Sequence, residues 1–160
     1  RERTVNRQGM RMEMVLIPPG RFYMGSPEGE TNRYDNEKRH RVILSKPYYI
    51  GKYEVTKAQW KAIMGESIQE YFKNSPSDAP MENISWDQCQ EFCKKTRLSL
   101  PTEAQWEYAC RGGATTPFNL GENITPDQVN YDGNYPYAGG QIGKYRQTPV
   151  SAGSLPNQNA

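Results

Sequence analysis

The residues of this sequence best suited to chemistry are its three cysteines and its single histidine. Cys89 and Cys93 lie four residues apart on a predicted helix, so their side chains point the same way and do not readily form a disulfide with each other. Cys110 could reach either of them only through a tertiary contact. Zinc is not expected, because there is no Cys-x-x-Cys pair and His40 is the only histidine. We interpret the thiols as buried, unpaired core side chains.

An acidic pair and the histidine are weaker candidates for proton transfer. Glu103 and Glu107 lie four residues apart on another predicted helix and could face a cleft as a general acid and base. We prefer a structural role, because an acidic side chain in the first turn, such as Glu103, complements the helix dipole. His40 lies among basic residues at the start of a predicted strand, with no nucleophile motif to serve, so we expect it on the solvated surface. The sequence contains no phosphate-binding glycine loop and no nucleotide fingerprint.

A cluster of side-chain oxygen donors lies between residues 123 and 134. Its members are Asn123, Asp127, Asn130, Asp132 and Asn134. Calcium takes about six to eight oxygens from carboxylates, amides and backbone carbonyls, often on irregular loops. The spacing does not match an EF-hand, and asparagine, aspartate and glycine also populate turns. Spacing alone therefore favours turn chemistry and leaves calcium as the alternative.

Three segments carry complete helix-start signals. Thr56, Ser85 and Thr102 are each followed three residues later by a glutamine, which predicts a capping box. An apolar residue before each cap is placed to pack against one at the fourth helical position. These pairs are Val55 with Trp60, Ile84 with Cys89, and Pro101 with Trp106. Gly65 and the Gly112-Gly113 pair are suited to end the first and third helices, and we expect Trp106 to be buried.

Short strands are expected in much of the remaining sequence. They span residues 14–17, 21–24, 41–44 and 48–55, the first two of them around the Pro18-Pro19-Gly20 turn. The charged segment 26–40 is typical of an exposed loop. Residues 119–145 are rich in Asn, Gly, Tyr and Asp and have almost no periodicity. We expect this long segment either to be mobile or to be ordered by something other than a hydrophobic core, such as a bound cation.

The composition fits a single domain of 160 residues, rich in turns and aromatic packing. The net charge is +2 with both signs interspersed, which does not indicate nucleic acid or an anionic membrane as a partner. No apolar run approaches the roughly 18 residues of a membrane span, and no signal-peptide pattern is present. The chain begins without methionine and stops in a polar stretch. We therefore interpret residues 1–160 as one domain truncated at its C-terminus.

Several motifs occur in the order found in one protein family. They are Met14 to Gly20, Met24 to Ser26, Tyr53 to Thr56 with Trp60, Asn83 to Trp86, Phe92-Cys93, Leu100 to Gly113, Thr148 to Val150, and Pro156-Asn157. On these residues, which span nearly the whole chain, the sequence resembles the formylglycine-generating enzyme family, also called the sulfatase-modifying-factor domain. The resemblance implies an α+β domain of the C-type-lectin-like type, with little regular secondary structure, short strands and about three helices.

The founding enzymes of that family convert a cysteine of a target sulfatase to formylglycine. They use molecular oxygen and a copper ion held by two active-site cysteines, and they carry structural calcium. The active-site cysteines belong to the family's C-terminal half, which would begin near Pro156, so the resemblance assigns no catalytic residue in this chain and copper only to an intact parent. Cys93 and Cys110 correspond to positions that form disulfides with C-terminal partners in some members. Those partners would lie beyond Ala160.

The resemblance carries the family's calcium site over in part. Asn130 and Tyr131 match a side-chain ligand and the backbone carbonyl that follows it, and Tyr145 corresponds to a later carbonyl. The family's intervening carboxylate is missing near Gly143, where Asp132 is the candidate substitute. With the resemblance included, we predict calcium at Asn130.

Two functions from different classes follow. The first is the N-terminal portion of a formylglycine-generating-enzyme-like domain, whose intact parent would act on a sulfatase-type polypeptide and which alone would not oxidise cysteine. The second is a non-catalytic binding or scaffold module, as in variable proteins of diversity-generating retroelements or domains fused to signalling proteins. An iron-dependent sulfoxide synthase of the ergothioneine type would need a histidine-rich partner domain, of which the sequence has no trace. The compartment and the oligomeric state do not follow from the sequence.

Overall fold

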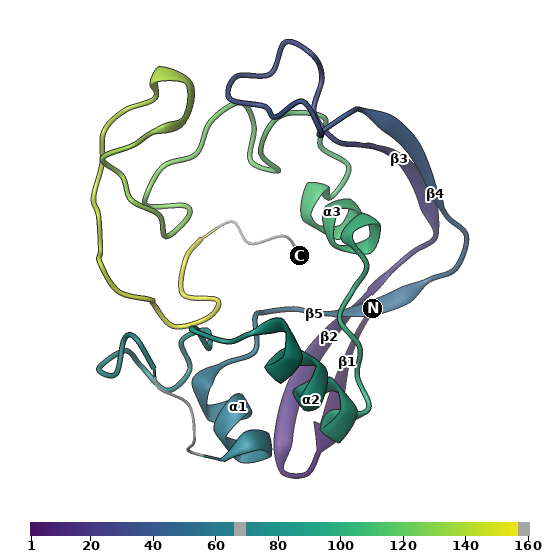
Figure 1. The fold of residues 1–160 in the computed structure, drawn as a ribbon, viewed down its shortest axis with the longest axis vertical. Coiled ribbons are helices and arrows are strands. Elements are labelled where there is room, and N and C mark those ends of the chain that lie inside the picture. The colour runs from purple at the N-terminus through teal and green to yellow at the C-terminus, as the bar shows by residue number, and fades with distance from the viewer. Residues whose placement is uncertain (66–69, 157–160) are drawn as a thin grey trace. The chain divides into compact units, whose positions relative to one another are not determined.

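The computed structural model describes residues 1–65 and 70–156 of the chain (Figure 1). They form two compact units. The first unit combines Arg1–Leu16, Tyr49–Leu100 and Arg146–Pro156, and the second combines Ile17–Tyr48 with Pro101–Tyr145. Short strands and three α-helices are joined by long irregular segments, as expected for the α+β class. No helix within the described residues has the length and apolar character that crossing a membrane requires.

The first unit is built on a three-stranded sheet in the order β1-β2-β5. The strands are β1 (Glu2–Arg7), β2 (Met10–Ile17) and β5 (Tyr48–Gly51). β1 and β2 pair antiparallel from Glu2 opposite Val15 to Arg7 opposite Met10. Gln8 and Gly9, which connect them, both have positive φ, as a tight hairpin turn requires.

The sequence prediction missed β1 and placed the start of β2 too late, at Met14. β1 is polar and buries only Val5, so its own residues carry no clear strand pattern. Pairing with β2 is what makes it a strand. β5 is shorter than the predicted 48–55 segment, because the chain leaves the sheet after Gly51.

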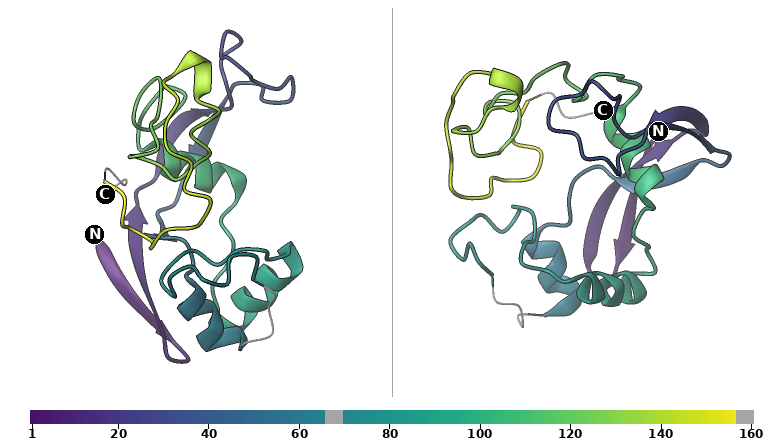
Figure 2. Two further views of the ribbon diagram at one scale, coloured as in Figure 1. Left: turned by 90° about the vertical axis from the view of Figure 1, so that its left-hand side faces the viewer. Right: turned by 45° about the horizontal axis from the view of Figure 1, so that its top comes forward.

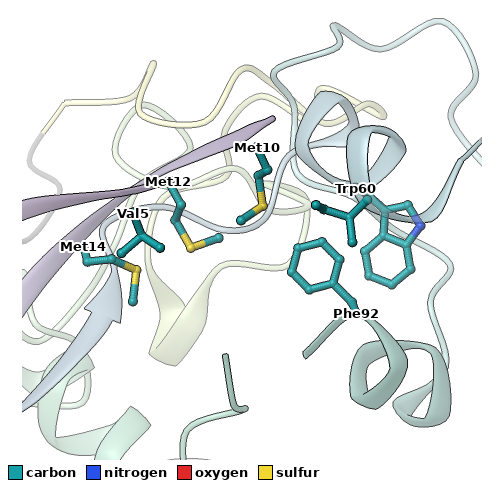
Figure 3. Close-up of a cluster of buried hydrophobic side chains, with 7 residues drawn as sticks. Val5, Met10, Met12, Met14, Trp60 and Phe92 are labelled. Carbon is teal, nitrogen blue, oxygen red and sulfur yellow. The ribbon is translucent and has the colours of Figure 1, made fainter. Parts of the chain in front are cut away.

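Helices α1 (Lys57–Met64) and α2 (Trp86–Thr96) begin at Thr56 and Ser85, where both predicted capping boxes are confirmed. They lie on the same side of the β1–β2 hairpin (Figure 2). Figure 3 shows the core between these elements. Its buried side chains are Val5, Met10, Met12, Met14, Trp60, Ile63 and Phe92. The alternate methionines of β2 supply one face of this core, as the two-residue period of a strand requires.

Aromatic stacking joins the two helices. The rings of Trp60 and Phe92 lie 5.1 Å apart, centroid to centroid, and only 5° from parallel. Val55 and Ile84, the apolar residues that precede the helix caps, pack against the same core. The individual contacts predicted for them, Val55 with Trp60 and Ile84 with Cys89, stay predictions.

A buried lysine in the first turn of α1 holds the segment 70–82 in place. Lys57 is only 6% exposed, and its Nζ donates to the Glu70 carboxylate at 2.8 Å and to the Phe72 carbonyl at 2.5 Å. The Glu82 carboxylate lies 3.7 Å from the same nitrogen and accepts from the backbone N–H groups of Tyr71 and Phe72. One ammonium group thus organises two carboxylates and the backbone between them.

The second unit pairs β3 (Gly20–Met24) with β4 (His40–Leu44) as an antiparallel ribbon. Helix α3 (Glu103–Arg111) packs against β3. The rings of Phe22 and Tyr108 are 5.3 Å apart, and a Cβ atom added at Gly20 would overlap the Tyr108 hydroxyl. The predicted strands on either side of the Pro18-Pro19-Gly20 turn exist, but they do not pair with each other, because each belongs to a different sheet.

Helix α3 confirms the predicted boundaries and corrects the predicted buried face. Thr102 forms the capping box with Gln105, and Gly112 ends the helix in the left-handed conformation. Trp106, expected to be buried, is 57% exposed, and Cys110 is exposed as well. The helix instead turns its Tyr108 side toward β3. Helical periodicity identified an apolar stripe, but the contact with β3 determines which side is covered.

Candidate functional site

The segment 119–145 is irregular, as predicted, and its regular element is one 3-10 turn, η1 (Tyr137–Gly139), drawn in yellow-green in Figure 1. Local turns order much of it. The Val129 N–H donates to the Thr125 carbonyl at 3.0 Å, and the Tyr135 N–H donates to the Asp132 carbonyl at 3.1 Å. Backbone hydrogen bonds therefore contribute to the order for which the sequence offered no hydrophobic pattern.

Two distant parts of this segment meet at a pair of glycines. Asp132 and Tyr145 form an isolated antiparallel bridge, and the Gly143 N–H donates to the Gly133 carbonyl at 2.8 Å. A Cβ atom on Gly133 would lie 2.6 Å from the carbonyl carbon of Gly143, so only glycine allows this approach. Asn130, Tyr131 and Asp132 are consecutive, and the bridge places the fourth predicted ligand, Tyr145, opposite Asp132.

Side chains of the predicted oxygen cluster shape the turns. The Asp132 Oδ1 accepts from the Asn134 backbone N–H at 3.0 Å and from its Nδ2 at 2.8 Å. The Asn123 Oδ1 accepts from the Ile124 N–H at 2.9 Å, and its Nδ2 donates to the Tyr137 carbonyl at 2.9 Å. The bonds between Asp132 and Asn134 have the spacing of a turn, whereas Asn123 links its own neighbourhood to Tyr137, fourteen residues further along.

The donors around the bridge also match the preferences of calcium. The amide of Asn130, the carbonyls of Tyr131 and Tyr145 and the carboxylate of Asp132 are all hard oxygen ligands. Across residues 1–65 and 70–156, His, Cys, Asp and Glu form no metal-binding cluster of three or more. A cation here would therefore depend on amide and carbonyl oxygens with a single carboxylate.

None of the three cysteines, all of which lie within the described residues, forms a disulfide, and their surroundings differ. Cys93 is buried and Cys89 half-buried on α2, whereas Cys110 on α3 is exposed. The prediction of buried thiols is thus confirmed for Cys93 and wrong for Cys110. Cys110 lies four residues after Trp106 on the same side of α3, and the orientation of the helix exposes both.

The surroundings of two of these thiols, Cys93 and Cys110, raise their pKa values. Burial raises the pKa of the Cys93 thiol, and nearby Cys89 raises it further, against a smaller opposing effect of a hydrogen bond with the Leu100 backbone. Desolvation of the sulfur also raises the pKa of Cys110, although the residue as a whole is exposed; Arg111 opposes this effect. Copper ligation requires thiolates, and these environments favour the protonated form.

The acidic pair on α3 has a structural role at Glu107. Its Oε1 accepts from the Gly25 N–H at 2.9 Å and from the Arg111 Nε at 2.8 Å. The Arg111 Nη2 lies 2.7 Å from the same oxygen and donates to the Gly25 carbonyl at 3.0 Å. We name this arrangement the Glu107 clamp. The sequence prediction did not identify Arg111 or Gly25 as its partners, although the four-residue spacing of Glu107 and Arg111 is the usual one for a helical ion pair.

The remaining proton-transfer candidate lies at the surface, as predicted. His40 is the first residue of β4 and is exposed. Its Nδ1 is 2.9 Å from the Lys38 carbonyl oxygen. That contact links the ring to the neighbouring backbone, and no nucleophile approaches it in the contacts of the described residues.

The elevated pKa of Cys93 predicts slow alkylation. The pKa of the Cys93 thiol in the folded chain exceeds its unfolded value of about 8.5. The protonated thiol therefore contributes fully to the stability of the folded chain below that pH, and this contribution is lost as the pH rises through the folded-state pKa. At a pH of about 8 we expect iodoacetamide to modify Cys93 at least about tenfold more slowly in the folded chain than in guanidinium. Mass spectrometry of the Cys93 peptide measures both rates. Half-buried Cys89 is the internal comparison, and equal Cys93 rates in the two states would contradict the burial.

Comparison with known proteins identifies the family. The model of the "Sulfatase-modifying factor enzyme 1-like domain" matches residues 2–158. Formylglycine-generating enzyme of Bos taurus is 25% identical over 88% of this chain and 52% of its own length. "Inactive C-alpha-formylglycine-generating enzyme 2" of Bos taurus is 23% identical over 94% of this chain and 66% of its own length. The chain thus spans about half the length of the formylglycine-generating enzyme that it matches.

Solved structures agree with this result. PvdO from Pseudomonas aeruginosa superposes with a TM-score of 0.59 at 26% identity, covering 67% of this chain and 50% of PvdO. Treponema denticola variable protein 1 has a TM-score of 0.61 at 22% identity, which is a likeness of fold alone, over 73% of this chain and 59% of that protein. The chain belongs to the sulfatase-modifying factor enzyme 1-like domain family and has the α+β fold of formylglycine-generating enzymes.

Proposed function

We propose that this chain is the scaffold portion of a formylglycine-generating-enzyme-type domain and that its own thiols do not oxidise cysteine. The state of the thiols is the observation that supports the proposal most directly. Cys93 is buried beside the core of the first unit, and the surroundings of Cys93 and Cys110 raise both pKa values. Thiols held in the protonated form are poor copper ligands and poor nucleophiles.

On this proposal, cysteine oxidation in a longer parent would depend on residues outside this chain. A sulfatase-type polypeptide would then be the substrate of that parent. The relatives include proteins named as formylglycine-generating enzyme and proteins named as inactive forms of it. Membership of the family is therefore compatible with an active enzyme and with an inactive protein. The protonated thiols of this chain favour inactivity of residues 1–160 by themselves.

The test is an aldehyde assay on the chain itself. The purified protein is incubated with a peptide carrying a sulfatase cysteine motif, cuprous copper and oxygen, and the aldehyde is captured with a hydrazide probe. We expect no aldehyde above the protein-free control, because a copper ion would lack a thiolate pair. Full-length formylglycine-generating enzyme from Bos taurus is the positive control. Aldehyde formed by the chain alone, and lost when Cys93 is changed to Ser, would overturn the proposal.

A structural calcium ion is the second part of the proposal. Its ligands would be the Asn130 side chain, the Asp132 carboxylate and the carbonyls of Tyr131 and Tyr145. The bridge between Asp132 and Tyr145 supports this set, because it draws together donors from two stretches of the segment. Bound calcium would attract oxygens from both stretches of the segment and so hold the two stretches together.

Calcium should then raise the melting temperature. At a calcium concentration about ten times its dissociation constant the gain is roughly 1.4 kcal/mol, or about 3–6 °C for a domain of this size. Differential scanning fluorimetry measures the shift, with magnesium as the ionic control. Asp132→Asn keeps an oxygen for the turn with Asn134 but removes the charge, so it should reduce the shift. Asp35→Asn, at an exposed loop position, is the matched control. An equal shift in the two variants, or no shift in the unsubstituted chain, would contradict the calcium site.

Exposed aromatic side chains favour the second candidate function, a non-catalytic binding module. Trp86, Trp106 and Tyr135 are all largely exposed. Aromatic residues are enriched where proteins meet other proteins, and these three side chains are accessible for such a contact. A binding function and an inactive scaffold are compatible, since neither requires the thiols.

A further inference from the structure

The β3–β4 ribbon has two chemically different faces. Phe22 and Val42 are directly opposite each other on one face, where Phe22 meets Tyr108 of α3. Alternation along the strands places the neighbours of these residues on the other face. That second face is exposed at every position between the ends of the paired strands.

The exposed face combines positive charge with apolar surface. Register places Arg21 opposite Ile43 and Tyr23 opposite Arg41. Tyr23 is 56% and Ile43 is 65% exposed. The guanidinium carbon of Arg39 lies 4.8 Å from the centroid of the Tyr23 ring. We name Arg21, Tyr23, Arg39, Arg41 and Ile43 the basic ribbon face.

Carboxylates do not balance this face. Neither β3 nor β4 contains an acidic residue, and Glu37, which lies just before β4, accepts a hydrogen bond from Ser26 Oγ at 2.6 Å. Among the ion pairs of residues 1–65 and 70–156, none includes Arg21, Arg39 or Arg41. Arg21 and Arg41 are diagonal neighbours across the ribbon, so their charges repel each other at short range, and an anionic partner would relieve that repulsion.

We propose that the basic ribbon face binds an extended polypeptide segment that presents two acidic residues two positions apart, with apolar residues next to them on the same side of the segment. Arg21 and Arg41 are diagonal neighbours across the ribbon, which corresponds to roughly 7–8 Å. Side chains two residues apart on an extended peptide project from the same side at a spacing of about 6.6 Å, so two successive carboxylates match the two guanidinium groups. Arginine is well suited to this contact because it binds a carboxylate with two parallel hydrogen bonds.

The apolar members of the face favour a polypeptide over a nucleic acid. Tyr23 and Ile43 offer surface for an aromatic or aliphatic side chain two positions before or after the carboxylates, on the same side of the extended peptide. Arg39 is already stacked on Tyr23, so part of the face is ordered before the partner arrives. A single-strand nucleic-acid site would need several stacking aromatics along a basic groove, and this face has one aromatic side chain.

The test is binding of a fluorescein-labelled peptide that carries valine, glutamate, glutamate and tyrosine at alternate positions, with serine between them, so that all four side chains lie on one side. Fluorescence anisotropy measures its affinity at about 50 mM and about 300 mM salt, and weakening with salt is expected. Arg39→Gln/Arg41→Gln should weaken binding by about tenfold or more. Lys73→Gln/Lys94→Gln removes the same charge at two other exposed positions and should change it by less than about twofold. Tyr23→Ser should weaken binding of this peptide more than binding of polyglutamate, because polyglutamate has no apolar side chain to contact Tyr23.

Several outcomes would overturn the proposal. The first is an equal loss of affinity for the acidic peptide in the two double variants. The second is equal binding of a peptide that has lysine in place of glutamate. The third is tighter binding of a single-stranded oligonucleotide than of the acidic peptide. Circular dichroism verifies that each variant is folded. Amide chemical-shift changes confined to β3 and β4 would support the proposal, and changes elsewhere without them would oppose it.

Discussion

A single carboxylate oxygen of Glu107 organises the second unit. It accepts from the Gly25 N–H and from the Arg111 guanidinium, which in turn donates to the Gly25 carbonyl. Gly25 has a φ of 88°, and a Cβ atom there would lie 2.9 Å from the carbonyl oxygens of Glu37 and Lys38. The clamp therefore joins α3 to the end of β3 at a point where the backbone is also tightly packed. The ribbon, its exposed basic face and the beginning of the loop after Gly25 all depend on this point.

Lys57 has the corresponding role in the first unit. Its buried ammonium group draws Glu70 and Glu82 toward the start of α1 and so orders the backbone that lies between them. Both arrangements combine an ion pair with bonds to backbone groups. Where regular secondary structure is sparse, such charge-assisted bonds satisfy peptide groups that a helix or sheet would otherwise satisfy. The ionic residues of this chain therefore serve its architecture at these two points.

Local signals in the sequence were sufficient for some of these features and not for others. The capping boxes at Thr56, Ser85 and Thr102 were predictable, because a cap involves only residues three positions apart. The β1 strand and the exposure of Trp106 were not, because distant partners determine both. In the candidate site, turn residues such as Asp132 were recognisable from composition. The bridge from Asp132 to Tyr145 required the structure, since a close approach of two glycines leaves no local pattern.

We conclude that helix α3, which carries the most recognisable motif of the family, serves the architecture and not proton transfer. Equilibrium denaturation of Glu107→Gln beside Glu103→Gln tests it most directly. Glu103 lies in the first turn of the same helix and is exposed. The free energy of unfolding of Glu103→Gln should therefore stay within about 0.5 kcal/mol of that of the unsubstituted chain. Loss of the charged bonds of Glu107 should lower the free energy of unfolding by roughly 2–3 kcal/mol. Equal stability of the two variants would contradict the claim.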